Sequence, residues 1–519
     1  MATVRAAVFA ALFLLGFSVP VWAQDVTLIS QDETVEISGT LLGFDGEYYR
    51  LDTIYGELTV DGSGVKCEGP GCPSLEDYVA ELSISGAASM GEVLLPALIE
   101  VFAQKSGHAL TREVKDDSHS EFILTDRVTQ KVTARFHIRK SNTDEGFADL
   151  LANEADLVMS LREVRENEAW LAREAGLGNL RAAGRSRVLA LDALVPILSP
   201  GNPLDRISTP DLAQVFSGDI SNWAQLGGPD APITVHVRDS KAGLGQAVED
   251  RLLGPVGKAI TADSVRHLSD QALADAVVAD PFGIGLASVT EIGNAKPVAL
   301  SGRCGFALGA ERKTIKTEDY PLTAPMFLYL PARRLPKVAR EFLSFTRSES
   351  AQLVIRRAGF TDQGVEEISI NDQGDRFANA IARSGDEIGL AELQRMVQVL
   401  GEMRRLTTTF RFETGSARLD AQSRSNVAQL AQALESGAYD TRRLLFVGFS
   451  DGEGPASANQ AIALRRAEAV REAVTKAAET ANFERLDMQV DAFGEAMPMA
   501  CDDSAWGRQV NRRVEVWLR

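Results

Sequence analysis

An acid and an arginine near the C-terminus are placed where they could act together on a charged ligand. The apolar run 444–447 predicts a strand, and the glycine-containing turn after it leaves Asp451 at the strand end. A helical pattern follows, in which Asn459 and Arg466 fall on one stripe together with core-type aliphatic residues. A carboxylate and a guanidinium in such positions can neutralise each other, or they can bind a ligand that carries both charges.

The elements around this pair predict a small α/β unit over residues 406–519. Its expected elements in chain order are a strand "TTFRF", a helix near 420–436, a strand at 443–449, a helix at 457–480, a strand near 486–493 and a final strand through 514–518. Residues 366–405 are polar and then helical, which predicts a helical connector to the preceding part of the chain.

This C-terminal block resembles the OmpA-like peptidoglycan-binding domain over its whole length. The matching motifs, in order, are "FRFETGSARLD", "GFSD", "NQAIALRRAEAV", "FGEAMP" and "GRQVNRRVEVW". The resemblance implies a βαβαββ fold and non-covalent binding to peptidoglycan. The chain departs from the usual Gly-His-Thr-Asp motif, because Phe449 replaces the histidine and Ser450 the threonine.

The resemblance also assigns residues to the wall ligand. The family's acid and second arginine, which bind diaminopimelate of the stem peptide, fall on Asp451 and Arg466. Diaminopimelate ends in an ammonium and a carboxylate, which suit an acid and a guanidinium. Asn459 is expected to brace the loop or to contact the peptide. Arg513 is included in the wall-binding set, although a structural role behind the contact residues is preferred for it.

Strand-like and helical stretches alternate between residues 76 and 365, which predicts an α/β domain. Its motifs "ISGAASMGEVLLPAL", "ADLVMSLREV", "ALDALVPILSPGNPL", "FSGDISNWAQLGG" and "VRDSKAGLGQAVED" resemble the periplasmic phosphate-binding proteins of ABC transporters. The resemblance implies two α/β lobes joined by a hinge, with an anion bound between them. An ABC permease would then be a natural partner.

Hydroxyl and arginine side chains of this domain match the family's anion site or lie beside it. The candidate anion ligands are Ser89, Thr143, Ser160, Arg162 and Arg238. Ser89 and Thr143 precede helical stretches, where N–H groups attract anions, so each is either a ligand or a helix N-cap. The family's Ser-Gly-Thr is Ala242-Gly243-Leu244 here, which removes two hydroxyl donors. Each lost bond to a charged ligand costs about 1.5–3 kcal/mol.

Residues 24–75 are β-rich, with turn signals at Asp45-Gly46 and Tyr55-Gly56, and predict a small barrel-like β domain. Cys67 and Cys72 enclose the segment "EGPG", which can bring two sulfur atoms together. With no histidine nearby, a local disulfide is predicted rather than a metal site. The sequence leaves open whether Cys304 and Cys501 pair or stay free.

Residues 1–23 have the pattern of a secretory signal peptide with cleavage near Ala23. The apolar core is short for a membrane span, and no later run of this kind is long enough to be one. The net charge of −18 argues against a nucleic-acid partner. A periplasmic, wall-attached protein is expected, and association with the outer membrane is left open.

The five histidines show no metal-ligand spacing, and the chain has no Walker loop. We therefore expect no enzyme activity, no catalytic residues, no cofactor and no metal. The leading hypothesis is a wall-anchored module that captures or senses phosphate or another oxyanion. The alternative is an envelope scaffold whose binding-protein fold has lost its small ligand and contacts another protein.

Overall fold

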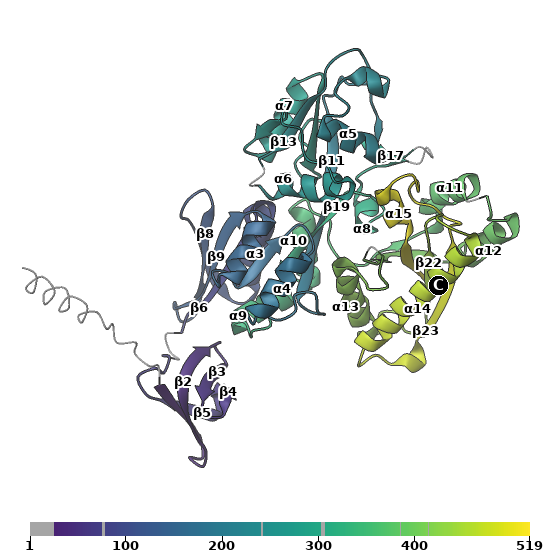
Figure 1. The fold of residues 1–519 in the computed structure, drawn as a ribbon. Helices are drawn as coiled ribbons and strands as arrows, with labels where there is room; N and C mark the ends of the chain where they lie inside the picture. Colours follow the sequence, from purple (N-terminus) through teal and green to yellow (C-terminus); the bar gives the residue numbers. More distant parts are fainter. Residues whose placement is uncertain (1–24, 75–77, 240–241, 303–306, 385, 414) are drawn as a thin grey trace, which may run out of the picture.

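The chain folds into an N-terminal, a middle and a C-terminal unit in this computed structural model (Figure 1). The structure describes residues 25–74, 78–239, 242–302, 307–384, 386–413 and 415–519. The predicted signal peptide and its cleavage site at Ala23 lie outside these residues, as does Cys304. Within the described ranges, no helix is both long and apolar enough to cross a membrane.

The N-terminal unit is one antiparallel sheet in the order β4-β3-β2-β1-β5. Its strands are β1 (Asp25–Ser30), β2 (Glu36–Phe44), β3 (Tyr48–Thr53), β4 (Gly56–Asp61) and β5 (Val65–Glu68). Hairpin turns lie at Gly46 and Gly56, whose φ values of 92° and 98° explain the glycines. No pairing joins β4 to β5 in the described part of the chain, so the sheet is open where the sequence predicted a barrel-like closure.

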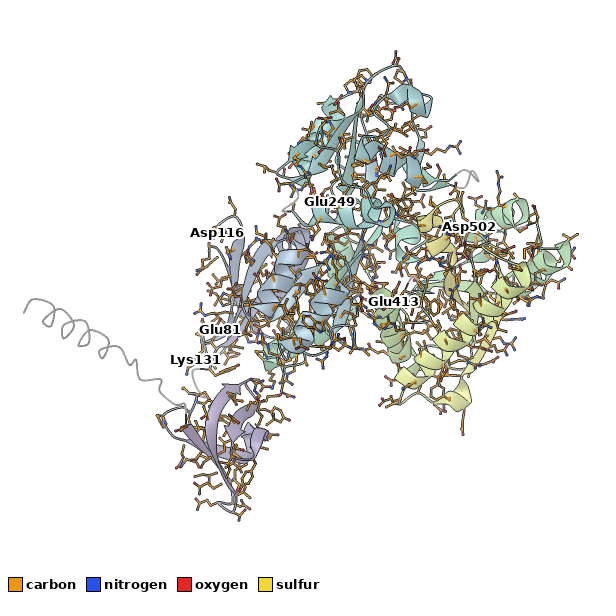
Figure 2. The ribbon with its side chains drawn as sticks, in the orientation of Figure 1. Glu81, Asp116, Lys131, Glu249, Glu413 and Asp502 are labelled. Atoms are coloured by element: carbon orange, nitrogen blue, oxygen red, sulfur yellow. A yellow bond between two sulfur atoms is a disulfide. The ribbon has the colours of Figure 1, made fainter. Side chains whose placement is uncertain are left out.

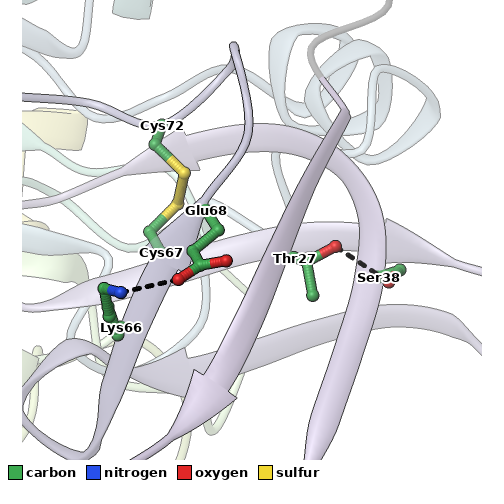
Figure 3. Close-up of a disulfide and its surroundings, with 6 residues drawn as sticks. All are labelled: Thr27, Ser38, Lys66, Cys67, Glu68 and Cys72. Atoms are coloured by element: carbon green, nitrogen blue, oxygen red, sulfur yellow. Dashed lines mark hydrogen bonds and ion pairs between the residues drawn. A yellow bond between two sulfur atoms is a disulfide. The ribbon is translucent and has the colours of Figure 1, made fainter.

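A disulfide closes the short loop after β5. Cys67 and Cys72 are bonded, with their Cα atoms 5.8 Å apart, as the sequence predicted (Figure 3). Such a bond restricts the loop in the unfolded chain and so stabilises the fold. Cys501 is not a free thiol.

The middle unit is built on one large sheet in the order β14-β13-β15-β11-β19-β10-β6-β9-β8-β7. The first lobe contains β6 (Ala80–Ala87), α2 (Leu95–Lys105), β7 (His108–Val114), β8 (His119–Asp126), β9 (Val132–Ser141), α3 (Thr143–Leu151), β10 (Leu157–Ser160), α4 (Glu166–Glu174), α9 (Lys337–Phe345) and α10 (Glu349–Arg357). The second lobe contains α5 (Thr209–Ser217), β13 (Thr234–Arg238), α6 (Gly243–Val248), η4 (Glu249–Leu253), β14 (Val265–His267), α7 (Asp270–Ala279) and β15 (Gly283–Ser288). A small sheet of β12 (Arg206–Ser208), β17 (Ala299–Ser301) and β18 (Ala307–Leu308) adjoins it.

Two long strands join the lobes. Strand β11 (Ser186–Leu198) pairs with β19 (Thr323–Tyr329) as far as Ala193 and with β15 from Leu194 onward. Strand β11 therefore belongs to both lobes, and its pairing partner changes between Ala193 and Leu194. This is the two-lobed fold with a hinge that the resemblance implied, and Figure 1 shows the lobes on either side of β11 and β19.

The C-terminal unit is a five-stranded sheet in the order β20-β21-β24-β22-β23. Its elements are β20 (Glu367–Ile368), α11 (Gly374–Arg383), α12 (Leu390–Leu400), β21 (Arg404–Arg411), α13 (Ala421–Glu435), β22 (Arg443–Phe449), α14 (Ala456–Ala477), β23 (Asp487–Gly494), α15 (Ala505–Asn511) and β24 (Arg513–Leu518). One face buries Leu444 and Phe446 against α13 and α14, and the other buries Leu445 and Val447 against α11 and α12. The segment 366–405, expected as a connector, thus supplies an edge strand and the helical cover of one face.

The C-terminal unit packs against the middle unit through buried contacts, and the two lie side by side in Figure 1. Trp506 and Val510 of α15 belong to the same apolar core as the lobes. Arg405 of β21, which is 1% exposed, donates to both carboxylate oxygens of Asp319 in the middle unit, at 2.6 and 3.0 Å. Because this ion pair is buried, the units are docked rather than joined only by a flexible linker.

Candidate functional site

The end of β22 and the turn that follows α15 bring an acid and an arginine together. The Asp451 side chain is 10% exposed, and its Oδ2 accepts a hydrogen bond from Arg512 Nη1 at 2.7 Å. Arg512 follows α15 directly and precedes the final strand. The acid that the resemblance assigns to the wall ligand therefore already has one cationic neighbour.

Arg466 stands on α14, and it has no carboxylate within ion-pair distance among the described residues. Its guanidinium lies over the Phe412 ring, 5.3 Å from the centroid. Burial lowers the pKa of Arg466, the positive charge of Arg512 lowers it further, and the negative charge of Asp451 acts in the opposite direction. The three charged groups therefore lie close enough to influence one another, and Arg466 has no anionic partner among the described residues.

Asn459 is buried at the first turns of α14, one stripe position before Arg466. Its Nδ2 donates to Glu495 Oε2 at 2.8 Å and more weakly to Gly454 O at 3.4 Å. The hydrogen bond to Gly454 O fixes the loop that carries Asp451. Bracing this loop is one of the two roles that the sequence predicted for Asn459. Its burial leaves the side chain behind the site surface.

Arg513 is fully buried and cannot contact a wall peptide in this structure. Its Nε donates to Glu515 Oε1 at 2.7 Å, its Nη2 donates to Met497 O at 3.1 Å, and its guanidinium lies 4.3 Å from the Phe449 ring centroid. Burial lowers the pKa of Arg513 to about 10. The side chain of Arg513 therefore stabilises the sheet face covered by α11 and α12, which is the structural role that the sequence favoured for it.

Two residues of this site were not identified from the sequence, namely Arg512 and Glu495. The motif "NRRVE" contains both arginines, and strand alternation puts Arg513 and Glu515 on one face. Arg512 lies before the first residue of the strand, so this alternation does not determine the direction of its side chain. Recognising that 374–400 covers one sheet face would have shown that Arg513 is buried and Arg512 is the available arginine.

The interlobe cleft is closed by the protein's own side chains at the predicted anion position. Thr143 is 1% exposed; its backbone N–H donates to Gln246 Oε1 of α6 in the other lobe at 3.0 Å, and its Oγ1 accepts from Leu161 N. A Cβ placed on Gly243 would lie only 3.1 Å from Ala87 Cβ across the cleft. The carboxamide oxygen of Gln246 thus accepts a hydrogen bond from the Thr143 backbone N–H at the start of α3. This N–H could otherwise bind an anion.

Ser160 and Arg162, two further anion candidates, are engaged within and between the lobes. Ser160 Oγ donates to Arg162 O at 2.6 Å. Arg162 is buried and donates to Glu168 at 2.6 and 2.9 Å, and it also pairs with Asp144. Its Nε lies 3.5 Å from Asp250 Oδ2 of η4 in the second lobe. Arg162 is therefore an ion-pair residue of the closed cleft, not a free anion ligand.

Arg238 contacts other residues through its guanidinium group, whereas the hydroxyl of Ser89 has no hydrogen-bond partner among the described residues. Arg238 is 7% exposed, its Nε lies 2.7 Å from Asp270 Oδ1, and its Nη1 donates to His267 O at 3.1 Å. Ser89 Oγ is buried and has no hydrogen-bond partner among the described residues. It does not cap the helical turn that follows it. Of the three hydroxyl candidates, only Ser89 has no hydrogen-bond partner among the described residues.

The described residues contain no group of three His, Cys, Asp or Glu side chains placed to hold a metal ion. The chemistry that these side chains offer is therefore ion pairing and hydrogen bonding by carboxylates, guanidinium groups and amides.

Comparisons with known proteins place both parts of the chain. A family model described as "PBP superfamily domain" matches residues 76–350, and a model described as "OmpA family" matches residues 411–512. The phosphate-binding protein PstS of Borreliella burgdorferi is 25% identical over 186 residues, which is 35% of this chain and 67% of that protein. Protein SphX of Synechococcus elongatus is 24% identical over 262 residues, covering 47% of this chain and 75% of the relative.

A solved structure is similar to the C-terminal part. The crystal structure of the peptidoglycan-associated lipoprotein from Burkholderia pseudomallei has 26% sequence identity and covers 21% of this chain and 89% of that one, with a TM-score of 0.19. At that TM-score the likeness adds nothing to what the two family models establish.

Proposed function

The chain belongs to the PBP superfamily and ends in an OmpA family domain, and from this premise we propose that it is exported to the periplasm and attached to peptidoglycan through its C-terminal domain. Its middle domain is then a binding-protein module held at the wall. Single contacts with the wall can be weak, because the polymer offers many identical sites and retains the domain locally.

The observation that carries the anchoring proposal is the convergence of Asp451, Arg466 and Arg512 on one partly buried site. The site holds one acid and two guanidinium groups, and Arg466 has no carboxylate partner among the described residues. Diaminopimelate of the stem peptide carries carboxylate and ammonium groups. A planar guanidinium can bind a carboxylate in two parallel hydrogen bonds, and such charge-assisted bonds are about twice as strong as neutral ones.

Sedimentation with purified peptidoglycan tests the anchor. We expect the full chain to sediment with the wall polymer, and the variants Arg466→Ala and Asp451→Asn to remain largely in solution. Arg465→Ala is the matched control, since Arg465 is the exposed neighbour on the same helix. Equal sedimentation of Arg466→Ala, Arg465→Ala and the unchanged protein would refute the assignment of these residues.

For the middle domain, the closed cleft favours a scaffold that contacts another envelope protein. The single observation behind this is the hydrogen bond from Thr143 N–H to Gln246 Oε1, which fills the donor position of α3 from the opposite lobe. Two hydroxyl donors of the family site are also missing at Ala242 and Leu244. At about 1.5–3 kcal/mol each, these losses would weaken anion binding by roughly two to four orders of magnitude.

Oxyanion capture is the second candidate, and the buried Ser89 Oγ, which has no partner among the described residues, is the observation in its favour. Calorimetry of the full chain with inorganic phosphate separates the two roles. The scaffold role predicts no binding heat and no thermal shift for the unchanged protein. Phosphate binding at micromolar concentration would overturn it, and Gln246→Ala should then bind more tightly because the Thr143 N–H becomes available.

A further inference from the structure

A cavity of about 300 Å³ lies where the C-terminal domain meets both lobes of the middle unit. Glu163 of the first lobe, Glu318 before β19 and Asp420 at the start of α13 all line it. Glu163 and Glu318 belong to the middle unit, so Asp420 joins them only when the C-terminal domain is docked. The wall of the cavity also includes Arg251 of η4 in the second lobe and Trp506 of α15.

The arginines around this cavity use their donors on backbone carbonyl groups rather than on the three acids. Arg251 donates to two carbonyl oxygens, at 2.8 and 2.9 Å. Arg411 also donates to carbonyl oxygens, and its Nε lies 4.0 Å from Glu318 Oε2. In the described part of the chain, neither Glu163 nor Asp420 has a cation within ion-pair distance. The acids are therefore brought together without close positive partners.

Glu163 and Asp420 both bind the first turn of α13. Glu163 Oε1 accepts a hydrogen bond from Ala421 N at 2.8 Å, and Asp420 Oδ1 accepts one from Ser423 N at 2.7 Å. A helix N-terminus favours a negative charge, but two carboxylates at the same turn repel each other. Docking thus favours a proton on one of these two side chains.

The surroundings of the three acids favour their neutral forms. Burial is the main cause that raises the pKa of Glu163 to about 7, that of Glu318 to about 8 and that of Asp420 above its ordinary value. The negative charge of Asp420 raises the pKa of both glutamates further. The positive charges that act in the opposite direction are those of Arg251, Arg411 and Arg424.

The remaining charged groups near the cavity are paired with other residues. They are Arg162, Asp250, Asp319 and Glu413, which pair with Glu168, Arg165, Arg405 and Arg418, respectively. Glu413, labelled in Figure 2 on the side of the C-terminal domain that faces the first lobe, adds to the negative charge near Glu163. Asp319 does the same near Glu318. Tyr320 also lines the cavity, and because burial raises its pKa it stays neutral.

We propose that Glu163, Glu318 and Asp420 form a pH-sensitive clamp: while protons are bound among them the C-terminal domain stays docked on both lobes, and when they ionise the domain is released and the cleft can open. The clamp reaches both lobes, because Glu163 is bonded to α13 and Trp506 Nε1 donates to Arg251 O at 2.9 Å. Release separates Asp420 from the glutamates and lets water reach all three carboxylates. This device does not depend on wall binding.

The direction of the pH effect follows from the raised pKa values. A carboxyl group of this kind stabilises docking fully below its ordinary pKa and loses that contribution as the pH rises through the raised one. For Glu163 and Glu318 this window runs from 4.5 to about 7 and about 8. The docked state then holds two extra protons up to about pH 7 and one up to about pH 8, and each lowers the docking constant tenfold per pH unit. Between about pH 6 and 8 that constant should fall by about a thousandfold.

Acrylamide quenching of tryptophan fluorescence in the full chain tests the clamp, because Trp506 lies in the docked interface and is 6% exposed. We expect the quenching constant to rise between about pH 6 and 9 while the far-ultraviolet circular dichroism stays unchanged. The variant Trp506→Phe should not show this rise. A constant that does not change with pH in the unchanged protein would overturn the clamp.

Two variants and a control separate the clamp from a general effect of pH. Glu163→Gln combined with Glu318→Gln removes both titrating glutamates and should keep the quenching constant at its value at low pH. Asp420→Asn preserves the N-cap and removes the charge that raises both pKa values, so its rise should be smaller. Glu166→Gln changes an exposed acid at the start of α4 and should behave as the unchanged protein.

An equal rise in the double variant and in the unchanged protein would overturn the clamp. If the double variant does not fold, Asp420→Asn replaces it, and a rise as large as that of the unchanged protein would then overturn it.

Discussion

The variant Arg405→Met removes the cation from the buried contact between the C-terminal and middle domains. Arg405 donates from Nη1 and Nη2 to Asp319 in a two-bond pair, and its Nε lies 3.3 Å from Glu515 Oε2. The side chains of Arg405, Asp319 and Glu515 are 1%, 5% and 0% exposed. Water therefore cannot replace the lost guanidinium without opening the interface.

The expected cost follows from what remains after the substitution. Burial alone would raise the pKa of Asp319, but the positive charge of Arg405 outweighs it and holds that pKa below its usual range. Glu515 keeps Arg376 and Arg513 as partners, whereas no other ion pair is seen for Asp319 among the described residues. Leaving one buried charge without its partner costs about 3–5 kcal/mol, so the free energy of unfolding should fall by that amount.

Urea denaturation followed by tryptophan fluorescence measures this loss, because Trp506 lies at the interface and Trp517 donates to Glu515. Arg404→Met is the matched control, since the Arg404 side chain is 58% exposed, and it should cost less than about 1 kcal/mol. The double variant Arg405→Met with Asp319→Leu should recover most of the loss. A single-variant loss under about 1 kcal/mol, or no recovery in the double variant, would refute the reasoning.

Further predictions concern pH, the disulfide and the buried arginine. Burial raises the pKa of Glu318 in the folded protein to about 8. The stabilising contribution of this side chain is therefore complete below the pKa that it has in the unfolded chain, and it is lost as the pH rises toward about 8. The free energy of unfolding should drop by about 3 kcal/mol between pH 5 and 8, and Glu318→Gln should flatten that slope in a urea series. Replacing Cys67 and Cys72 with serine should cost the N-terminal domain about 2 kcal/mol, measured by its melting, with wall sedimentation unchanged. Arg513→Lys should lower stability by about 2–3 kcal/mol, because lysine cannot reproduce the planar fork, yet the folded protein should bind wall peptide as before.

The C-terminal fold was predictable from sequence because each of its elements has a strong local signal. Strand β22 is a continuous apolar run, and α14 keeps an apolar stripe over 22 residues. The strand end and the helix start are adjacent in the chain, so the local patterns placed Asp451 and Arg466 on neighbouring elements. Their assignment to one ligand came from the resemblance to the OmpA-like domain and not from periodicity.

The state of the interlobe cleft could not be predicted in the same way. The contact between Thr143 and Gln246 joins residues 103 positions apart in different lobes, and it exists only when the lobes are closed. Likewise Arg162 finds Asp250 only across the closed cleft. The sequence identifies side chains able to bind an anion, but not whether another part of the chain occupies them first.

The segment 366–405, which was expected to be a connector, shows a second limit on what the sequence can predict. Residues 374–400 have a helical pattern with apolar positions, and that pattern does not say what those positions pack against. In the structure Met396 and Leu400 are fully buried beneath the sheet of the C-terminal domain. This packing buries Arg513 as well, and the sequence alone did not show that its side chain lies away from the surface of the site.

The C-terminal domain is bonded to both lobes, and this restricts how the middle domain can move. Ala421 N donates to Glu163 Oε1 of the first lobe at 2.8 Å, and Trp506 Nε1 donates to Arg251 O of the second lobe at 2.9 Å. Separating the lobes about β11 must break one of these contacts or strain the buried pair of Arg405. A ligand shifts such an equilibrium only by its differential affinity for the two states. An anion that opens or recloses this cleft must therefore work against the domain that we propose to bind the wall, which favours a fixed module over a freely closing carrier.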